Sequence, residues 1–217
     1  MAKRVTLTFD NGPTPGVTDR ILDLLKERNI KTTFFVVGQQ LSDPARRALT
    51  ERARAEGHWV GNHSLTHSVP LGEKVDPEYA RAEIGTPQML LGELLEPNKF
   101  FRPFGGGGHV GDLLFSPAAF ELLQQEGYTI VLWTSVPGDW RDQEHWVENC
   151  VADVTVQEWP VVVIHDLDNA SLPRLPELLD RLTAMGVEFT QQFPESVIPM
   201  RGGELQWPID HLIKQAA

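Results

Sequence analysis

Residues 5–13 read VTLTFDNGP, and the interpretation of the whole chain starts from this stretch. Apolar residues at 5, 7 and 9 alternate with threonines at 6 and 8, which predicts a β-strand. The residues that follow, Asp10 to Pro13, have the composition of a turn. Ligands and catalytic groups of α/β proteins collect where strands end, so Asp10 and Asn11 are candidates for a site. A simple tight turn explains the same residues equally well.

The rest of the chain alternates predicted strands with predicted helices about seven times, which indicates an α/β fold with a parallel sheet. Polar motifs follow the first, third, fourth, fifth and sixth strands, and their convergence on one rim favours a β/α barrel over an open sheet. No nucleotide-binding glycine pattern follows the first strand. We expect one domain over 1–217, with a core of about 4–190 and a C-terminal tail, 191–217, of little periodicity. After the first, the predicted strands are 32–37, 58–60, 99–102, 128–133, 161–164 and 187–189.

The composition is that of a globular protein with an excess of acidic residues. Lys and Arg number 19 against 30 Asp and Glu, which gives a net charge of −11. This balance disfavours nucleic acid as a partner and suits a neutral or cationic substrate. The single cysteine, Cys150, cannot form an internal disulfide. The apolar stretch 161–164 is too short to span a membrane, and no signal peptide is recognisable, so we expect no membrane partner and a cytoplasmic location unless a targeting segment was removed.

His63 and His67 are four residues apart. On a helical turn this spacing places both imidazoles on one face, where they can share a cation. The same pattern arises often by chance or as a capping pair. A catalytic divalent metal requires a third ligand, for which Asp10 and Asn11 are the candidates.

Two further residues stand at predicted strand ends. His165 directly follows an apolar strand and is either a core histidine bonded to Asp166 or a general acid paired with Asp139. Arg102 either orients Asp10 through a bidentate contact or forms a surface ion pair.

Aromatic side chains close to the strand ends are candidates for a sugar-binding wall. Trp133, Trp140 and Trp159 have flat faces that suit a sugar ring, whereas core packing is the more common role of a tryptophan.

Taken together, the motifs resemble the five ordered motifs of polysaccharide deacetylases, the NodB-type domain of carbohydrate esterase family 4. The resemblance runs from residue 8 to residue 166. It implies a distorted β/α barrel of seven to eight strands that hydrolyses N- or O-acetyl groups on sugars with a divalent metal, expected to be zinc. The matching segments are TFDNGP (8–13), GNHSLTH (61–67), FRPFG (101–105), Asp139-Trp140 and VIHD (163–166).

The resemblance also implies a role for each matching residue. Asp10 would be the catalytic base, oriented by Arg102, and His165 would be the catalytic acid, tuned by Asp139. The metal would be held by Asn11, His63 and His67, and the substrate would contact Phe104, Gly105 and Trp140.

Two departures from the family pattern bear on these roles. The usual second aspartate of the first motif is Asn11, a neutral residue that predicts weaker metal binding or none. The third motif is one residue short and runs into further glycines, which loosens the loop expected to bind the oxyanion. Two alternatives to the metal-dependent deacetylase therefore stay open. One is a metal-optional hydrolase of another C–N bond, such as a ureide or formamide, and the other is a degenerate carbohydrate-binding barrel.

Overall fold

The opening stretch forms strand β1 (Arg4–Asp10) in the computed structural model, which describes residues 3–214. β1 lies between two parallel neighbours, β2 (Thr33–Val36) and β6 (Val161–His165). Both faces of β1 are buried. The apolar residues at 5, 7 and 9 pack in a hydrophobic cluster, while Thr6, Thr8 and Asp10 occupy the other face. The alternation in the sequence thus separates an apolar buried face from a polar buried face.

The strands follow the order β6-β1-β2-β3-β4-β5-β8-β9, and β7 pairs with the start of β1. The pairs up to β5 are parallel, whereas β8 and β9 are antiparallel. An isolated parallel bridge between Ser135 and Val162 brings the segment after β5 back beside β6. The result is the distorted β/α barrel that the motifs imply. The remaining strands are β3 (Trp59–Asn62), β4 (Phe100–Phe101), β5 (Thr129–Ile130), β7 (Glu188–Phe189), β8 (Met200–Arg201) and β9 (Glu204–Leu205).

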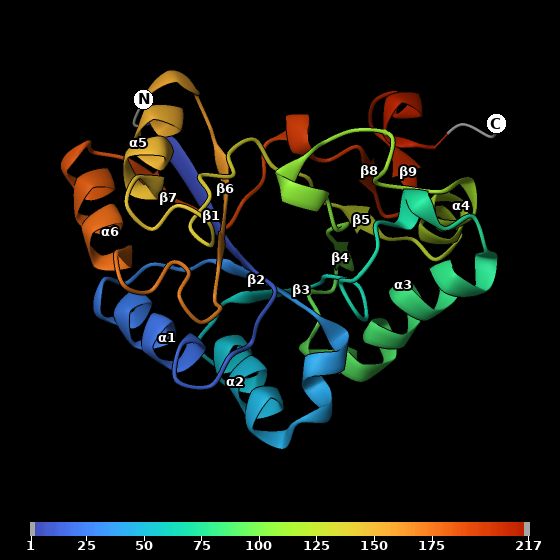
Figure 1. The fold of residues 1–217 in the computed structure, drawn as a ribbon, viewed down its shortest axis with the longest axis horizontal. Helices are drawn as coiled ribbons and strands as arrows, with labels where there is room; N and C mark the ends of the chain where they lie inside the picture. Colours follow the sequence, from blue (N-terminus) through green and yellow to red (C-terminus); the bar gives the residue numbers. More distant parts are fainter. Residues whose placement is uncertain (1–2, 215–217) are drawn as a thin grey trace.

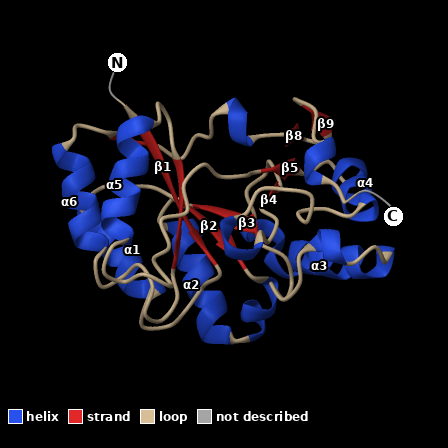
Figure 2. Cartoon of the chain, turned by 45° about the horizontal axis from the view of Figure 1, so that its top comes forward, coloured by secondary structure: helices blue, strands red, loops and turns tan. Residues whose placement is uncertain are grey.

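The helices lie outside the strands (Figures 1 and 2). Helices α1, α2, α5 and α6 surround the half of the molecule that contains β1, and α3 and α4 lie beside β4 and β5. No helix within residues 3–214 is long and apolar enough to cross a membrane. The helices are α1 (Thr18–Glu27), α2 (Pro44–Ala55), α3 (Pro77–Leu91), α4 (Pro117–Gln125), α5 (Trp146–Val156) and α6 (Leu175–Ala184). Short 3₁₀ helices cover Gly38–Ser42, Leu71–Glu73, Gly92–Leu94, Gly106–Gly108, Glu195–Val197 and Asp210–Leu212.

Three helices begin at the cap-then-proline pairs that the sequence contains. The side chains of Asp43 and Asp76 accept from backbone amides two residues ahead, at 2.8 and 3.0 Å, and Ser116 accepts from Ala119 at 3.2 Å. Each cap satisfies an amide that the first helical turn leaves unpaired, and the following proline needs no such partner. These helix starts are confirmed.

Two predicted boundaries are wrong because the elements end early, one through a tertiary contact and one at a glycine. The fifth strand ends at Ile130 instead of Trp133, since the amide of Leu132 turns to the carbonyl of Val197 at 2.8 Å. Helix α3 ends at Leu91 instead of about 95, where Gly92 adopts a positive φ of 52°.

The core has two parts, one on each side of the strands. The first lies under α1, α5 and α6, and the second lies under α3 and α4. The sequence predicts little regular structure after residue 191. This segment nevertheless supplies β8, β9 and five apolar residues of the second cluster. These buried residues are Val197, Ile198, Met200, Ile209 and Leu212.

Candidate active site

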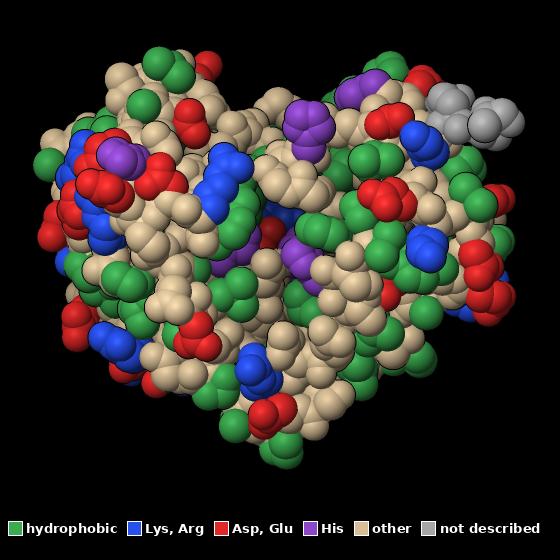
Figure 3. Space-filling view, viewed as in Figure 1, with side chains coloured by type: hydrophobic (Ala, Val, Ile, Leu, Met, Phe, Trp, Pro, Cys, Tyr) green, Lys and Arg blue, Asp and Glu red, His purple; other side chains and the backbone are tan. Residues whose placement is uncertain are grey.

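The polar motifs meet at one end of the strands because neighbouring strands are parallel and in register. Asp10 is the register partner of His165 across β1 and β6, and Asn62 is the partner of Phe101 across β3 and β4. The residues that follow these strand ends line a cleft of about 300 Å³. Figure 3 shows its mouth near the middle of the face, with histidine and hydrophobic side chains around it. Its lining includes Asp10, Asn11, His63, His67, Phe104, Gly105, Trp133, Trp140 and His165.

Arg102 enters the barrel beneath the cleft and holds Asp10. Its side chain is fully buried, with the guanidinium carbon 3.9 Å from the ring centre of Phe35. Nη1 donates to Asp10 Oδ1 at 2.8 Å and to Thr8 Oγ1 at 2.6 Å, while Nε and Nη2 donate to two backbone carbonyls after β5 at 3.3 Å. The predicted bidentate contact is therefore wrong, because the other donors serve the backbone. Burial lowers the pKa of Arg102, and the Asp10 carboxylate opposes this effect.

The two histidines of the second motif lie on a loop and not on the helical turn that their spacing predicts. Ser64 and His67 have positive φ values of 64° and 52°, which a helix does not allow. The loop still brings the rings of His63 and His67 to 4.8 Å, centre to centre. His63 Nδ1 lies 2.9 Å from the Arg102 carbonyl, which can only accept, so this nitrogen carries the proton. Its Nε2 is left as a free acceptor, 3.5 Å from Asp10 Oδ2.

Glu83 of α3 holds this histidine loop, and it lies outside the motifs that predict the site. Its Oε2 accepts from the amides of Leu65 and Thr66 at 3.1 and 3.0 Å, and its Oε1 accepts from the Thr66 hydroxyl at 2.7 Å. Glu83 is 4% exposed and lies among the buried positions of α3. A carboxylate on the apolar stripe of a helix is the signal that would have identified it.

Asn11 lines the same cleft as these histidines and carries an unused acceptor. It has a φ of 77°, a left-handed conformation that asparagine tolerates better than most residues. Its Oδ1 is buried and has no hydrogen-bond partner in the described part of the chain. Burial, together with neighbouring positive charge, lowers the pKa of His63 and of His67 to about 3, so both rings stay neutral and able to bind a metal.

These three side chains fit a divalent cation. Residues 3–214 contain no group of three His, Cys, Asp or Glu that could hold a metal. For a cation held here, the third donor would be the amide oxygen of Asn11, which is an acceptable though uncharged ligand.

His165 pairs with Asp139, and not with Asp166. His165 Nδ1 lies 2.8 Å from Asp139 Oδ1, and its backbone amide donates to Asp139 Oδ2 at 2.8 Å. Burial disfavours a charged His165, but the hydrogen bond and the negative charge of Asp139, with that of Asp10, outweigh it and raise the pKa of the ring. The ring of Trp140 meets His165 edge-on at 4.7 Å.

Asp166 points away from the cleft and binds the first loop. It accepts from the Gly12 amide at 2.9 Å and from the Thr18 hydroxyl at 2.6 Å. Burial raises the pKa of Asp166 to about 7, and the two hydrogen bonds oppose that rise.

Aromatic side chains form the walls of the cleft. The ring of Phe104 lies 4.0 Å from that of His67, and Trp133 Nε1 donates to the Gly108 carbonyl at 2.9 Å. A Cβ atom on Gly105 would lie 2.8 Å from the Trp133 ring, so this position requires glycine. The glycine loop is thus anchored on Trp133. Trp159 lies outside the cleft, under the guanidinium of Arg4 at 3.6 Å.

Comparison with known proteins identifies the family. The sequence model named "Polysaccharide deacetylase" matches residues 1–131. The chain is 28% identical over 191 residues to the peptidoglycan-N-acetylglucosamine deacetylase PgdA of Listeria monocytogenes, a match that covers 86% of this chain and 37% of PgdA. It therefore spans little more than a third of the length of that curated relative.

Solved structures show the same fold. The polysaccharide deacetylase Bc1974 from Bacillus cereus superposes with a TM-score of 0.74 at 26% identity, covering 92% of this chain and 96% of Bc1974. A family 4 acetyl xylan esterase from Clostridium thermocellum, solved with a cobalt ion, gives a TM-score of 0.70 at 29% identity and covers 87% of this chain and 88% of the esterase. On the family match, the fold and the ordered motifs, this chain belongs to the polysaccharide deacetylase family.

Proposed function

We propose that this chain hydrolyses the N-acetyl groups of amino sugars in a polysaccharide or oligosaccharide, such as peptidoglycan. The main support is the position of Asp10 and His165, register partners on adjacent strands that line one cleft. A carboxylate and a histidine facing one cleft can divide proton removal and proton delivery between them. The named activity of the PgdA relative supports an N-acetylated amino sugar as the substrate.

We also propose that Asn11, His63 and His67 hold a divalent cation, which we expect to be zinc. The support is the unpartnered Asn11 Oδ1 and the two neutral rings, all three of which belong to the lining of one cleft. The related esterase solved with cobalt is consistent with a divalent metal. Such a cation supplies Lewis-acid chemistry, which activates water and stabilises negative charge on the acyl oxygen. The Nδ1–H of His63 is fixed on the Arg102 carbonyl, which keeps Nε2 available as a ligand.

Asp10 is the base in this proposal. Arg102 occupies its Oδ1, so Oδ2 is the oxygen free to take a proton from the attacking water. The fixed guanidinium keeps the carboxylate oriented. Water adds to the acetyl carbon as its proton passes to Asp10 Oδ2.

His165 is the acid. Its Nδ1 is engaged by Asp139, so Nε2 is the nitrogen left to protonate the leaving amine. Its raised pKa keeps the ring protonated closer to neutral pH, as amide hydrolysis requires. The C–N bond breaks as the nitrogen takes the proton, and the products are acetate and the free amino sugar.

Acetate release tests the proposal directly. N-acetylglucosamine oligomers and peptidoglycan are incubated with the protein and either added zinc or a chelator. We expect release with zinc and none with the chelator. The His165→Ala variant should bind zinc as the natural chain does while its turnover falls by about 10²–10⁴-fold. Loss of zinc together with turnover in that variant would show that His165 has another role.

A second candidate is a metal-optional hydrolase of another C–N bond, such as a ureide or formamide. The observation that favours it is Asn11, a neutral residue where a charged ligand would hold a cation more tightly. Hydrolysis of small ureides or formamides in the presence of chelator, without acetate release from sugars, would support this candidate against the deacetylase.

A further inference from the structure

Asp166 is a buried carboxylate that the proposed chemistry does not use. It comes directly after His165, the last residue of β6. His165 lines the cleft, while Asp166 accepts hydrogen bonds from the loop between β1 and α1 and from the first residue of α1. Asp166 is 1% exposed, and each of its two oxygens accepts one hydrogen bond, from Gly12 and from Thr18.

The contact with Gly12 leaves no room for a side chain. A Cβ atom built on Gly12 would lie 2.0 Å from Asp166 Oδ2. On the other side of the same residue, the Gly12 carbonyl accepts from the Val37 amide at 3.2 Å. Gly12 is thus held between the end of β2 and the end of β6.

The restraint on the Gly12 amide also restrains the backbone conformation of Asn11. The amide that Asp166 binds belongs to the peptide unit that joins Asn11 to Gly12, so its orientation sets the ψ angle of Asn11. Asn11 has a positive φ of 77° and a buried Oδ1 without a partner in the described residues. An unusual backbone conformation persists when its surroundings hold it, and Asp166 supplies such a restraint.

Thr18 extends the restraint to α1. Its hydroxyl accepts from the Thr14 amide at 2.7 Å and donates to Asp166 Oδ2 at 2.6 Å. Thr18 is the first residue of α1, so the carboxylate also lies beside the positive end of that helix. One side chain therefore connects β6, the first loop and the start of α1.

We propose that Asp166 is a positioning residue that holds Asn11 in its ligand conformation through Gly12 and Thr18. The strand that carries the proposed acid thereby orients the loop that carries the proposed metal ligand. The inference rests on the proposed function for what Asn11 binds. The restraint itself is a property of the metal-free chain and is tested there.

The test compares Asp166→Ala, Asp166→Asn and Thr18→Val with a matched control, Ser135→Ala. Ser135 is also buried, and its hydroxyl donates to the Asp153 carboxylate at 2.6 Å, away from the first loop. In metal-free protein, amide hydrogen exchange over residues 11–18 should speed up in Asp166→Ala and Thr18→Val and stay unchanged in Ser135→Ala. Asp166→Asn keeps an oxygen for the Gly12 amide and should restore most of the protection.

Zinc affinity, measured by competition with a chelating dye, gives the second readout. We expect it to fall by about 10–100-fold in Asp166→Ala and by less in Asp166→Asn. At saturating zinc, kcat should fall because Asn11 is no longer held in position. KM should stay unchanged, because Asp166 does not face the cleft. If Asp166→Ala does not fold, Thr18→Val carries the same test.

The proposal would be overturned if Asp166→Ala had the same amide exchange rates over residues 11–18 and the same zinc affinity as the unsubstituted chain. A natural chain that binds zinc but releases no acetate would instead refute the proposed function, and would leave the exchange and zinc results on Asp166 valid.

Discussion

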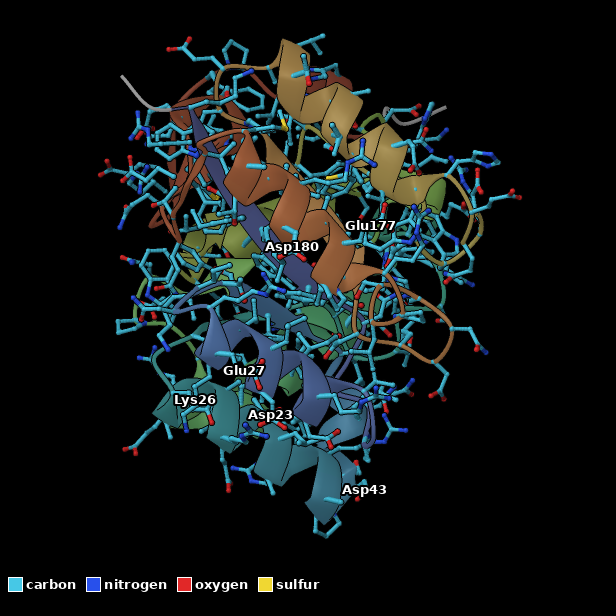
Figure 4. All side chains as sticks on the ribbon, turned by 90° about the vertical axis from the view of Figure 1, so that its left-hand side faces the viewer. Asp23, Lys26, Glu27, Asp43, Glu177 and Asp180 are labelled. Carbon is cyan, nitrogen blue, oxygen red and sulfur yellow. The ribbon has the colours of Figure 1, made fainter. Side chains whose placement is uncertain are left out.

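The charged pairs of the cleft are buried, whereas those on the outer faces of the helices lie in water. Arg102 and Asp10 have side chains 0% and 5% exposed, while those of Arg52 and Asp23 on α2 and α1 are 31% and 62% exposed. Figure 4 shows the outer side, where the labelled Asp23, Lys26, Glu27, Asp43, Glu177 and Asp180 come from α1, α6 and the start of α2. Asp23 and Asp180 pair with Arg52 and Arg28 of a neighbouring helix or its end, and Asp43 and Glu177 pair with arginines three residues away.

The two regions differ in the cost of removing one partner of a charged pair. In the cleft, removal of one partner leaves a charge without water, which costs far more than the pair contributes as a whole. On the helices, water replaces a lost partner, and salt already screens the attraction. The same residue types therefore hold a reactive geometry in one region and provide minor stabilisation in the other.

The largest effect should follow Arg102→Gln. This change leaves Asp10 buried without its cation, and we expect the free energy of unfolding to fall by about 3–5 kcal/mol. Urea unfolding measures it, with Arg52→Gln as the matched surface variant. Equal losses in the two variants would contradict the distinction between the regions.

The next effect concerns the second buried pair and is seen in the pH profile. Asp139 raises the pKa of His165, so Asp139→Asn should lower that pKa. A general acid works only while protonated, and activity therefore declines as pH rises through its pKa. In Asp139→Asn the alkaline decline should begin at lower pH, and kcat at pH 8 should fall by about 10²-fold. A reduced kcat with an unshifted profile would mean that Asp139 only supports the structure.

Asn11→Asp adds a carboxylate to the buried region. With zinc present, the new charge should raise metal affinity by about 10–100-fold. In chelator, the same carboxylate would stand near Asp10 without a cation, and the midpoint of urea unfolding should fall. Titration with a chelating dye and unfolding with and without zinc measure both effects. Unchanged zinc affinity would show that position 11 is not a ligand.

The sequence predicts those parts of the fold that local chemistry determines. The alternation in β1 and the capping residues Asp43, Asp76 and Ser116 act over a few positions, and the structure contains the expected elements. The bend of the chain after β5 depends on Val197, far along the sequence, so no local pattern could reveal it.

The candidate site divides in the same way. The ordered motifs bring Asp10 and His165 to one cleft and Arg102 beneath it, as expected from their strand ends. Of the supporting carboxylates, Glu83 is not predicted from the sequence, and for Asp166 the sequence suggests only a bond to His165, as one of two alternatives. Glu83 binds a loop 17 and 18 residues away and Asp166 binds Gly12 at a separation of 154, so their partners follow from packing and not from spacing.

The smallest effect should be the coupling between Arg52 and Asp23 on the outer face. Arg52 Nη2 lies 2.5 Å from Asp23 Oδ1, and Arg52 Nε lies 2.8 Å from Glu56. A double-mutant cycle with Arg52→Gln and Asp23→Asn should give a coupling energy of about 0.2–1 kcal/mol, because both partners are hydrated and mobile when apart. The coupling should shrink in 1 M salt, where screening acts over about 3 Å. A coupling of several kcal/mol that persists in salt would show that this exposed pair is as strongly coupled as a buried pair. Exposure would then no longer explain why Arg102 and Arg52 differ.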